Sequence, residues 1–159
     1  MSATEQLLEA EFELGFTYTR SLGPVIGTCF AALAQKRFLG MRRADGSVLF
    51  PPLEYDPDTA APLDEWVELG NTGVVEGFCW VKQPRKKHAE PAPFAWALIK
   101  LDGADTPFLH KVRAAGESQV RVGLRVIPLW INEPLGDITD IAAFVADSTN
   151  DDVKGEVGT

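Results

Sequence analysis

Residues 42–59 constrain the fold more than any other stretch, because they combine a tight turn with a run of prolines. Asp45-Gly46 supplies the positive φ that a tight hairpin turn needs. Val48-Leu49-Phe50 then return as a strand, and Pro51-Pro52 end the pairing, since proline lacks a backbone N–H. We therefore predict a β-hairpin over residues 37–50.

The same stretch keeps the frame of a zinc ribbon, in which four thiolates converge tetrahedrally on one ion. In the pattern C-x-x-C-G-x-x-x-F-P-P-x-x-x-C-P-x-C, the four ligand positions are occupied by Arg42, Asp45, Asp56 and Thr59. None of these is Cys or His, whereas the glycine, the Phe-Pro-Pro and the proline after Asp56 stay in register. We predict that this ribbon binds no zinc.

Three segments, 21–25, 46–57 and 136–142, resemble a family of small bacterial and archaeal acyl-CoA-associated proteins of formerly unknown function. The resemblance implies N-terminal helices, a rubredoxin-like zinc ribbon and a C-terminal OB fold, together with association with a thiolase-like enzyme. The chain is most similar to the sub-group that joins a lipid-transfer-protein-like thiolase homologue as an aldolase in steroid side-chain breakdown. It departs from the family in having lost every zinc ligand.

We expect a mainly β protein in four parts. These are a helical arm (1–36), a metal-free ribbon (37–62), an OB-fold domain (63–147) and a disordered acidic tail (148–159). Pro24 suits the first turn of a helix, which we place at 24–36. Residues 3–14 are either a short amphipathic helix or an acidic solubilising terminus. Residues 60–64 are predicted to link the ribbon to the OB-fold domain.

From residue 65 onward, short apolar segments alternate with glycine-containing turns. The predicted strands fall within 66–69, 74–81, 94–101, 106–112, 119–131 and 138–145. Five or six short strands at this spacing favour a small barrel, and the OB fold is a five-stranded barrel. Gly77 and Gly123 are expected where the strands bend or bulge.

Composition excludes several functions. The formal net charge of −8 and the pI of about 4.7 argue against a nucleic-acid partner, which calls for a basic face. The aromatic side chains are therefore predicted to be mostly core and not a base-stacking platform: Phe78, Trp80, Phe94, Trp96, Phe108 and Trp130. Cys29 and Cys79 fit no ligand spacing and are expected to be buried free thiols. With no apolar run of about 20 residues, a cytoplasmic protein is expected.

The sequence offers little chemistry of its own. It contains neither a phosphate-binding G-x-x-x-x-G-K-[ST] nor a G-x-S-x-G motif. His88 and His110 each stand alone, so we expect surface or strand positions and no catalytic base. Asp45, Asp56 and Asp58 fit no calcium-binding pattern and are expected to serve turn geometry. We predict no catalytic residue, no metal and no cofactor in this chain.

Residues 85–88, Arg-Lys-Lys-His, are the main basic cluster in this acidic chain. Cationic side chains donate strong hydrogen bonds to phosphate, so Arg85, Lys86 and Lys87 are candidates for contacting the phosphates of an acyl-CoA. The alternative is a solvated loop tip.

We predict that a helix face and the ribbon bind the partner subunit, in an assembly with two copies of each chain. Both surfaces carry apolar side chains without an evident place in the chain's own core, and a knuckle that has lost its metal needs other support. The predicted interface consists of Phe30, Leu33, Val48, Leu49, Phe50, Pro51, Pro52, Leu53 and Tyr55.

Three functions stay open at this point. The first is the accessory subunit of an acyl-CoA aldolase or of a thiolase or acyltransferase, with the catalytic residues on the partner. The second is a stand-alone OB module that binds acyl-CoA or an oligonucleotide. The third is an independent small enzyme, such as a thioesterase or hydratase. The lack of a paired acid and base on one element disfavours the third.

Overall fold

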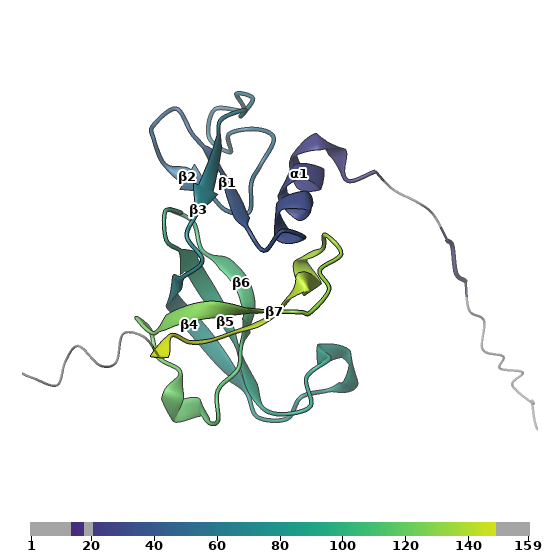
Figure 1. Ribbon diagram of the computed structural model, residues 1–159, viewed down its shortest axis with the longest axis vertical. Coiled ribbons are helices and arrows are strands. Elements are labelled where there is room, and N and C mark those ends of the chain that lie inside the picture. The colour runs from purple at the N-terminus through teal and green to yellow at the C-terminus, as the bar shows by residue number, and fades with distance from the viewer. Residues whose placement is uncertain (1–13, 18–20, 149–159) are drawn as a thin grey trace, which may run out of the picture.

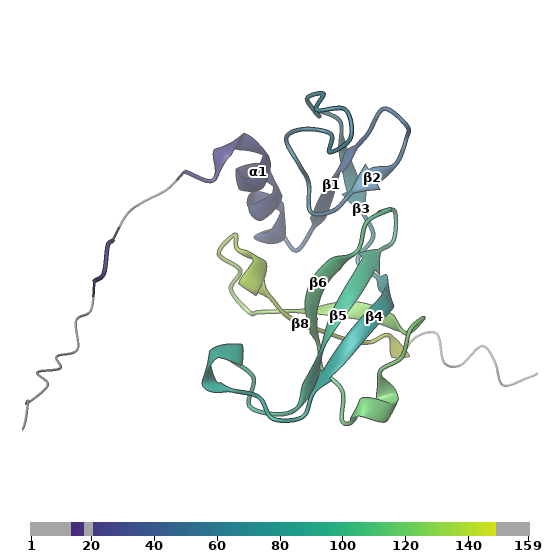
Figure 2. The same ribbon diagram turned by 180° about the vertical axis from the view of Figure 1, so that it is seen from behind.

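The computed structural model describes residues 14–17 and 21–148. Within these residues one α-helix, eight strands and three short 3-10 helices follow one another along the chain. The helix and a three-stranded sheet form an upper part that sits on a barrel, as both views show (Figures 1 and 2). No helix in the described part is long and apolar enough to cross a membrane.

The helix, α1, spans Gly23–Leu33 and has a proline in its first turn. Its buried face consists of Val25, Cys29, Ala32 and Leu33. Burial raises the pKa of the Cys29 thiol to about 11. The helix predicted at 24–36 is thus confirmed but ends earlier, in a turn that places Lys36 at a φ of 59°. The second predicted helical segment, residues 3–14, lies almost entirely outside the described residues.

The predicted hairpin is confirmed. β1 (Phe38–Arg42) pairs with β2 (Val48–Leu49) in antiparallel register, with Met41 opposite Leu49. Gly46 sits in the connecting turn at a φ of 88°, a conformation that glycine adopts at little cost.

A third strand joins this hairpin, and the sequence analysis had assigned it to the barrel. β3 (Trp66–Leu69) pairs antiparallel with β1, which gives the sheet order β2-β1-β3. Residues 60–64 also do more than link two domains. The Ala61 carbonyl accepts from the Asp56 amide at 2.8 Å, and the Leu63 amide donates to the Glu54 carbonyl at 2.9 Å. The ribbon sheet therefore extends to residue 69, because the backbone groups of β1 that β2 leaves unpaired form hydrogen bonds with β3.

The other five strands close into a barrel in the order β4-β5-β6-β8-β7. Their bounds are β4 Gly73–Val81, β5 Phe94–Leu101, β6 Phe108–Val112, β7 Arg125–Trp130 and β8 Ile141–Ala146. β6 and β8 run parallel and are joined by the single pair Val112–Phe144. Five strands in this order are an OB fold, so the predicted fold class is confirmed.

Of the two glycines predicted at bends or bulges of strands, Gly77 lies at a bulge and Gly123 lies in a loop. The register of β4 shifts between Val75 and Gly77, so the predicted bulge is confirmed. Gly123 instead lies in the loop before β7 at a φ of 85°, and the strand predicted from residue 119 begins only at Arg125. A glycine at positive φ ends an extended segment, which the apolar pattern alone did not reveal.

One apolar core runs through both parts of the molecule. Phe38 of the ribbon packs with ring centroids 5.2 Å from Trp130 and 6.5 Å from Phe144, both in the barrel. Leu33 of α1 belongs to the same buried cluster. The ribbon and the barrel thus share a core.

Candidate functional site

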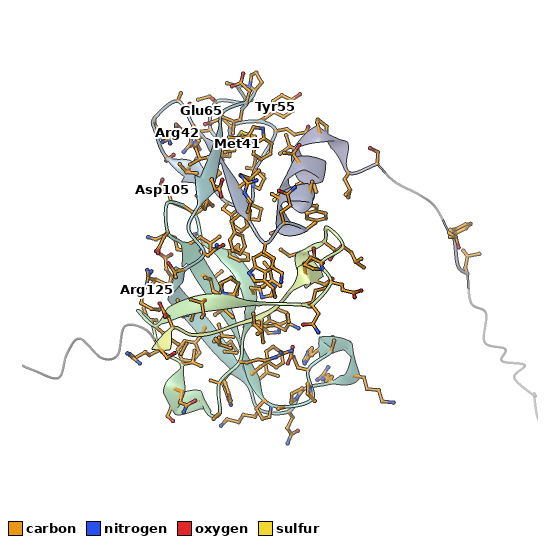
Figure 3. The ribbon with its side chains drawn as sticks, in the orientation of Figure 1. Met41, Arg42, Tyr55, Glu65, Asp105 and Arg125 are labelled. Atoms are coloured by element: carbon orange, nitrogen blue, oxygen red, sulfur yellow. The ribbon has the colours of Figure 1, made fainter. Side chains whose placement is uncertain are left out.

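The four positions that would hold zinc in a ribbon are engaged in other contacts. Arg42 donates from Nε to Glu65 at 2.7 Å and from Nη1 to the Gly46 carbonyl at 3.1 Å. Asp45 accepts from the amide and the hydroxyl of Ser47, at 2.9 and 2.6 Å. Arg42 and Glu65 lie together on the ribbon sheet (Figure 3). This donor set does not fit zinc, and in the described residues no group of three or more His, Cys, Asp or Glu is placed to hold a metal ion.

A guanidinium group connects the two loops of the ribbon that hold these positions, one around Asp45 and the other around Asp56. Arg43 donates to both carboxylate oxygens of Asp56, at 2.7 Å from Nε and 3.2 Å from Nη2. It also pairs with Asp58, and with Asp45 at 3.3 Å. Asp56 is nearly buried, with 6% of its side chain exposed. One cation thus bridges carboxylates from both loops.

Asp56 gathers further donors from its own loop. The backbone amides of Asp58 and Thr59 each donate to its Oδ1 at 2.9 Å. The hydrogen bonds from Arg43 and then those from the backbone hold the pKa of Asp56 well below its ordinary value. The hydrogen bonds that Arg43 makes with the side chains of Asp56 and Asp58 raise the pKa of Arg43. The ion pair therefore remains charged throughout the physiological pH range.

Most of the predicted interface is buried in the chain's own core, which corrects that prediction. Leu33, Val48, Leu49 and Phe50 are between 1% and 6% exposed, and Pro52 is buried too. The Phe50 ring lies edge-on to Phe38 at 5.5 Å and to Phe108 of β6 at 4.9 Å. These side chains had seemed to lack a place because their contacts lie far along the chain, in the barrel.

The edge of β2 is also hydrogen-bonded to the barrel. The Val48 amide donates to Asp105 Oδ2 at 2.7 Å, and the Asp105 amide donates to the Val48 carbonyl at 2.8 Å. The Phe50 amide donates to Thr106 Oγ1 at 2.8 Å, and that hydroxyl donates back to the Phe50 carbonyl at 2.9 Å. Asp105 lies where the barrel meets the sheet (Figure 3). The second predicted strand of the ribbon is thus closed off by the β5–β6 loop.

The rest of the predicted interface stays accessible. Leu53 is 44% exposed and Tyr55 is 59% exposed. Pro51 is exposed and Phe30 is partly buried. Tyr55 lies at the end of the ribbon away from the barrel (Figure 3).

The basic loop carries the 3-10 helix η1 (Lys86–His88) between β4 and β5. Arg85, Lys86 and Lys87 are exposed, and none of them forms an ion pair with a described residue. His88 anchors the loop, since its Nδ1 accepts from the Arg85 amide at 3.1 Å and its ring lies 5.7 Å from that of Phe94. Three cationic groups are thus presented to solvent from a fixed turn.

A buried carboxylate fixes the other end of this loop. Glu90, with 2% of its side chain exposed, accepts from Lys111 of β6 at 2.6 Å and from Arg113 twice at 3.0 Å. Burial alone would raise the pKa of Glu90, but the hydrogen bonds from Arg113 and Lys111 outweigh it and lower the pKa. The loop is therefore held against β6.

A groove of about 420 Å³ opens between this loop, β5, β6 and β8. Its rim includes Lys87, and the 3-10 helix η3 (Ile138–Asp140) forms one wall. The groove lies where only one residue pair joins β6 to β8. It is lined by Lys87, His88, Ala89, Trp96, Leu109, His110, Lys111, Ile138, Thr139, Ile141 and Ala142.

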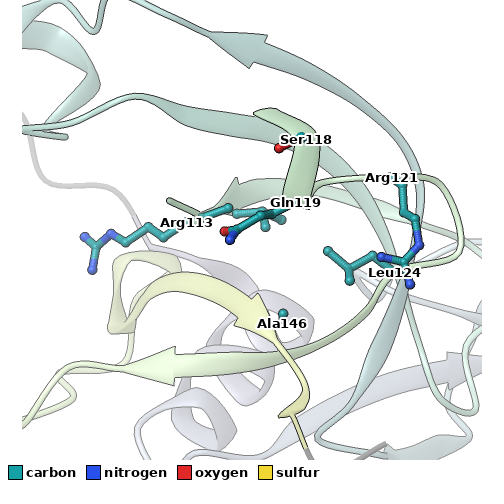
Figure 4. Close-up of a pocket in the computed structure, with 8 residues that line it drawn as sticks. Arg113, Ser118, Gln119, Arg121, Leu124 and Ala146 are labelled. Atoms are coloured by element: carbon teal, nitrogen blue, oxygen red, sulfur yellow. The ribbon is translucent and has the colours of Figure 1, made fainter. Parts of the chain in front are cut away.

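A second pocket of similar volume lies at another part of the barrel, beside the 3-10 helix η2 (Glu117–Gln119) (Figure 4). Its polar side chains are largely used within the chain. Arg113 is paired with Glu90, and Gln119 accepts from the Ala115 amide at 2.9 Å. Arg113 also points away from Arg121 and Leu124 (Figure 4). We assign no role to this pocket.

The barrel is similar to known proteins in sequence and in fold. Residues 66–130 match the family described as ChsH2, C-terminal OB-fold domain. The match takes in β3 and the barrel strands β4 to β7. The family resemblance drawn from the sequence is therefore confirmed, although no curated protein sequence matches the chain.

Two solved structures share the fold over most of this chain, the ChsH2-type barrel included. A DUF35-family protein of unknown function from Sulfolobus solfataricus matches with a TM-score of 0.61 and 19% identity, over 79% of this chain and 85% of that chain. A structure described as the Ltp2-ChsH2(DUF35) aldolase matches with a TM-score of 0.54 and 22% identity, over 75% of this chain and 91% of that one.

The sequence analysis missed an apolar face on the outside of the ChsH2-type barrel. Leu98 of β5 and Leu109 of β6 are cross-strand partners that are 44% and 61% exposed. Trp96 and the exposed Cys79 also form a cross-strand pair, so the expectation of two buried thiols holds only for Cys29. A signal was present, since residues 94–99 are all apolar. Such a strand has two apolar faces, and a barrel interior buries only one.

Proposed function

We propose that this chain is a non-catalytic subunit of an acyl-CoA aldolase, bound to a partner of the thiolase superfamily. In this role it completes a complex that cleaves a β-hydroxyacyl-CoA by a retro-aldol reaction, with a steroid side chain as the acyl group. The catalytic residues belong to the partner. The proposal includes an assembly with two copies of each subunit.

The observation that carries this proposal is the barrel. Residues 66–130 match the ChsH2 OB-fold family, and 75% of the whole chain, ribbon included, matches 91% of a chain of the Ltp2-ChsH2(DUF35) aldolase in fold. That complex pairs an OB-fold chain of this kind with a second protein.

The ionisable groups support a role without catalysis. A general acid or base that works near neutral pH commonly has its carboxyl pKa raised by burial. Six described carboxylates have a pKa that is shifted downward: Asp45, Asp56, Glu68, Glu90, Asp102 and Asp140. Their partners are arginine, lysine, hydroxyl or backbone N–H groups. These carboxylates stabilise loops and strand ends.

Two surfaces support partner binding. The first is the accessible part of the ribbon, Leu53 and Tyr55, with Pro51 and Phe30 beside it. The second is the outer barrel face around Leu98 and Leu109. Exposed apolar patches of this kind mark protein interaction sites. The free cations Arg85, Lys86 and Lys87 are then available for the phosphates of the acyl-CoA.

The test is co-expression with a thiolase-like subunit encoded next to this chain. We expect a complex of two plus two chains by size-exclusion chromatography with light scattering, and retro-aldol turnover that neither subunit shows alone. The double variant Leu53→Asp, Tyr55→Asp and the variant Leu98→Asp identify which surface the partner covers. Turnover by the isolated chain, or a partner that stays separate from it at micromolar concentrations, would rule out the proposal.

The closed ribbon favours a second candidate, a stand-alone acyl-CoA-binding module. A chain whose hairpin is already covered by its own barrel can fold without a partner, and the groove and basic loop are open to a ligand. This candidate predicts acyl-CoA binding by the isolated chain that the partner leaves unchanged. Calorimetric titration with and without the partner separates the two functions.

A further inference from the structure

The groove beside η3 contains a polar group that the rest of the protein leaves unsatisfied. His110 lies in its wall and is 6% exposed, and its Nδ1 is buried without a hydrogen-bond partner among the described residues. The sequence analysis had expected His110 to be surface or strand decoration. Buried polar groups are nearly always hydrogen-bonded, so each exception calls for an explanation.

The surroundings of His110 are aromatic. Its ring centroid lies 5.9 Å from that of Phe108 and 5.5 Å from that of Phe144. Burial lowers the pKa of His110, and hydrogen bonding with the backbone of Lys111 and Ile138 opposes this only in part. The imidazole is therefore neutral near pH 7, with one N–H and one lone pair to offer.

The groove walls around this ring are mostly apolar. Trp96 of β5, Leu109 of β6, Ile138 of η3 and Ile141 of β8 converge on it from four elements. A volume of about 420 Å³ falls within the range of small-molecule sites, which combine apolar walls with a few polar groups that fix orientation. The groove also lies between β5, β6 and the loops at one end of the barrel, where OB folds bind their ligands.

We propose that this groove binds a small apolar molecule that carries a hydroxyl group, and that His110 Nδ1 is the hydrogen-bond partner of that hydroxyl. A hydroxyl donates and accepts, so it satisfies Nδ1 in either imidazole tautomer. Nδ1 is shielded in this structure. The proposal therefore requires the ring to turn about its Cβ–Cγ bond, a torsion with broad, roughly two-fold minima, so that Nδ1 faces the ligand.

This site goes beyond the proposed function, because it needs neither the partner nor a CoA group. It also differs from the basic loop, whose cations face solvent. Lys87 reaches the rim of the groove, whereas the contact assigned here lies at its wall.

A matched pair of probes tests the assignment on the isolated full chain. 4-Ethylphenol and 4-ethyltoluene have nearly the same shape and differ in a hydroxyl against a methyl group. Protein labelled with ¹⁵N at histidine is titrated with each probe, and both the Kd values and the His110 ring resonances are followed by NMR. We expect 4-ethylphenol to bind about tenfold more tightly, the effect of one net hydrogen bond, and to shift the Nδ1 resonance.

His110→Phe keeps the aromatic packing and removes the ring nitrogens. It is expected to abolish the preference for the phenol. It also removes the hydrogen bonding of the ring with the backbone of Lys111 and Ile138, so the Tm is measured alongside the binding to show that the variant is folded. Equal affinities of the two probes for the wild-type protein, or a preference that survives in His110→Phe, would overturn the proposal.

A second variant keeps the test decisive if His110→Phe folds poorly. Ile138→Arg fills the groove from its exposed wall and should abolish binding of both probes. Leu135→Arg is the control, because Leu135 is 87% exposed and does not line the groove. Binding that persists in Ile138→Arg would place the probes elsewhere and refute the assignment.

Discussion

The ribbon sheet and the barrel are stabilised in different ways. The barrel closes five strands around an apolar interior in which Val75, Ile99 and Val126 are fully buried. The ribbon has three short strands and carries ion pairs along its surface, such as Arg37 with Glu68 and Arg42 with Glu65. A small sheet cannot build a sufficient core alone, and small domains commonly rely on metals for this reason.

The comparison shows which contacts support the ribbon in place of a metal site. Within the ribbon, Arg43 links the two knuckles through Asp56 and Asp58. Outside it, Phe50 enters the barrel core and the edge of β2 bonds to the β5–β6 loop. The ribbon is thus covered by the chain's own barrel, and we expect the isolated chain to be stable without a partner.

The largest predicted effect comes from the shared core. Phe50→Ala removes a ring that contacts Phe38 in the ribbon and Phe108 in the barrel, and should lower the free energy of unfolding by about 3–5 kcal/mol. Because the ring belongs to both regions, they should still melt in one transition, as measured by calorimetry. Tyr55→Ala is the matched control and should change stability by less than about 0.5 kcal/mol. Two separate transitions in the wild-type protein would mean that the regions do not share a core.

The next largest effect is expected for Arg43, whose substitution should lower the Tm more than substitution of an arginine in a surface ion pair. Arg43→Gln leaves Asp45, Asp56 and Asp58 facing one another without a cation, and should lower the Tm by about 5 °C. Arg42→Gln removes an arginine that pairs with the exposed Glu65 and should shift the Tm by about 1 °C or less. Equal shifts in the two variants would contradict a bridging role for Arg43.

This difference should depend on pH. The folded state lowers the pKa of Asp56, so the stability from its pair with Arg43 is fully present above the ordinary Asp pKa of about 3.9. It is lost as the pH falls further, through the lower pKa of the folded state. The gap in Tm between wild type and Arg43→Gln should therefore be constant above about pH 5 and shrink below pH 4. A gap that widened on acidification would refute this reading.

A smaller effect tests the seam between the two regions. Thr106→Val keeps the side-chain shape but removes both hydrogen bonds to Phe50, and should cost about 1–2 kcal/mol. Hydrogen exchange should become faster in β2 and stay unchanged in β5. Thr28→Val, at an exposed helix position, is the control and should leave exchange in β2 as it is.

The smallest effect on stability is expected in the basic loop. Replacing Arg85, Lys86 and Lys87 together by Ala removes no internal ion pair, so the Tm should stay within about 1 °C. If these cations contact CoA phosphates, the triple variant should raise the KM of the complex several-fold and leave kcat nearly unchanged. An unchanged KM at low salt would identify the loop as a solvated tip.

The sequence predicted local features well. The Asp45-Gly46 turn, the helix start at Pro24 and the strand pattern of the barrel all depend on nearby residues. The pairing of strands that are distant in the sequence was harder to predict. Nothing near residue 66 indicates that β3 pairs with β1, since strand partners are chosen by packing of the whole chain.

The site was predicted less completely than the fold. Arg43 was overlooked because the metal-ligand pattern directs attention to Arg42, the residue before it and the last one of β1. The burial of Phe50 was missed because its partner Phe108 lies 58 positions away in the sequence. His110 gave no local sign of burial, because its environment is made by β6, β8 and η3 together.

The most direct test of this account is hydrogen exchange on the isolated chain in the presence of EDTA. If Arg43 and the barrel have replaced the metal, the amides of Val48 and Phe50 should be protected nearly as well as those in the middle of β5, and elemental analysis should find no zinc. If these amides instead exchange at the rate of an open loop while β5 stays protected, or if added zinc slows their exchange, the ribbon needs a metal or a partner and the account is wrong.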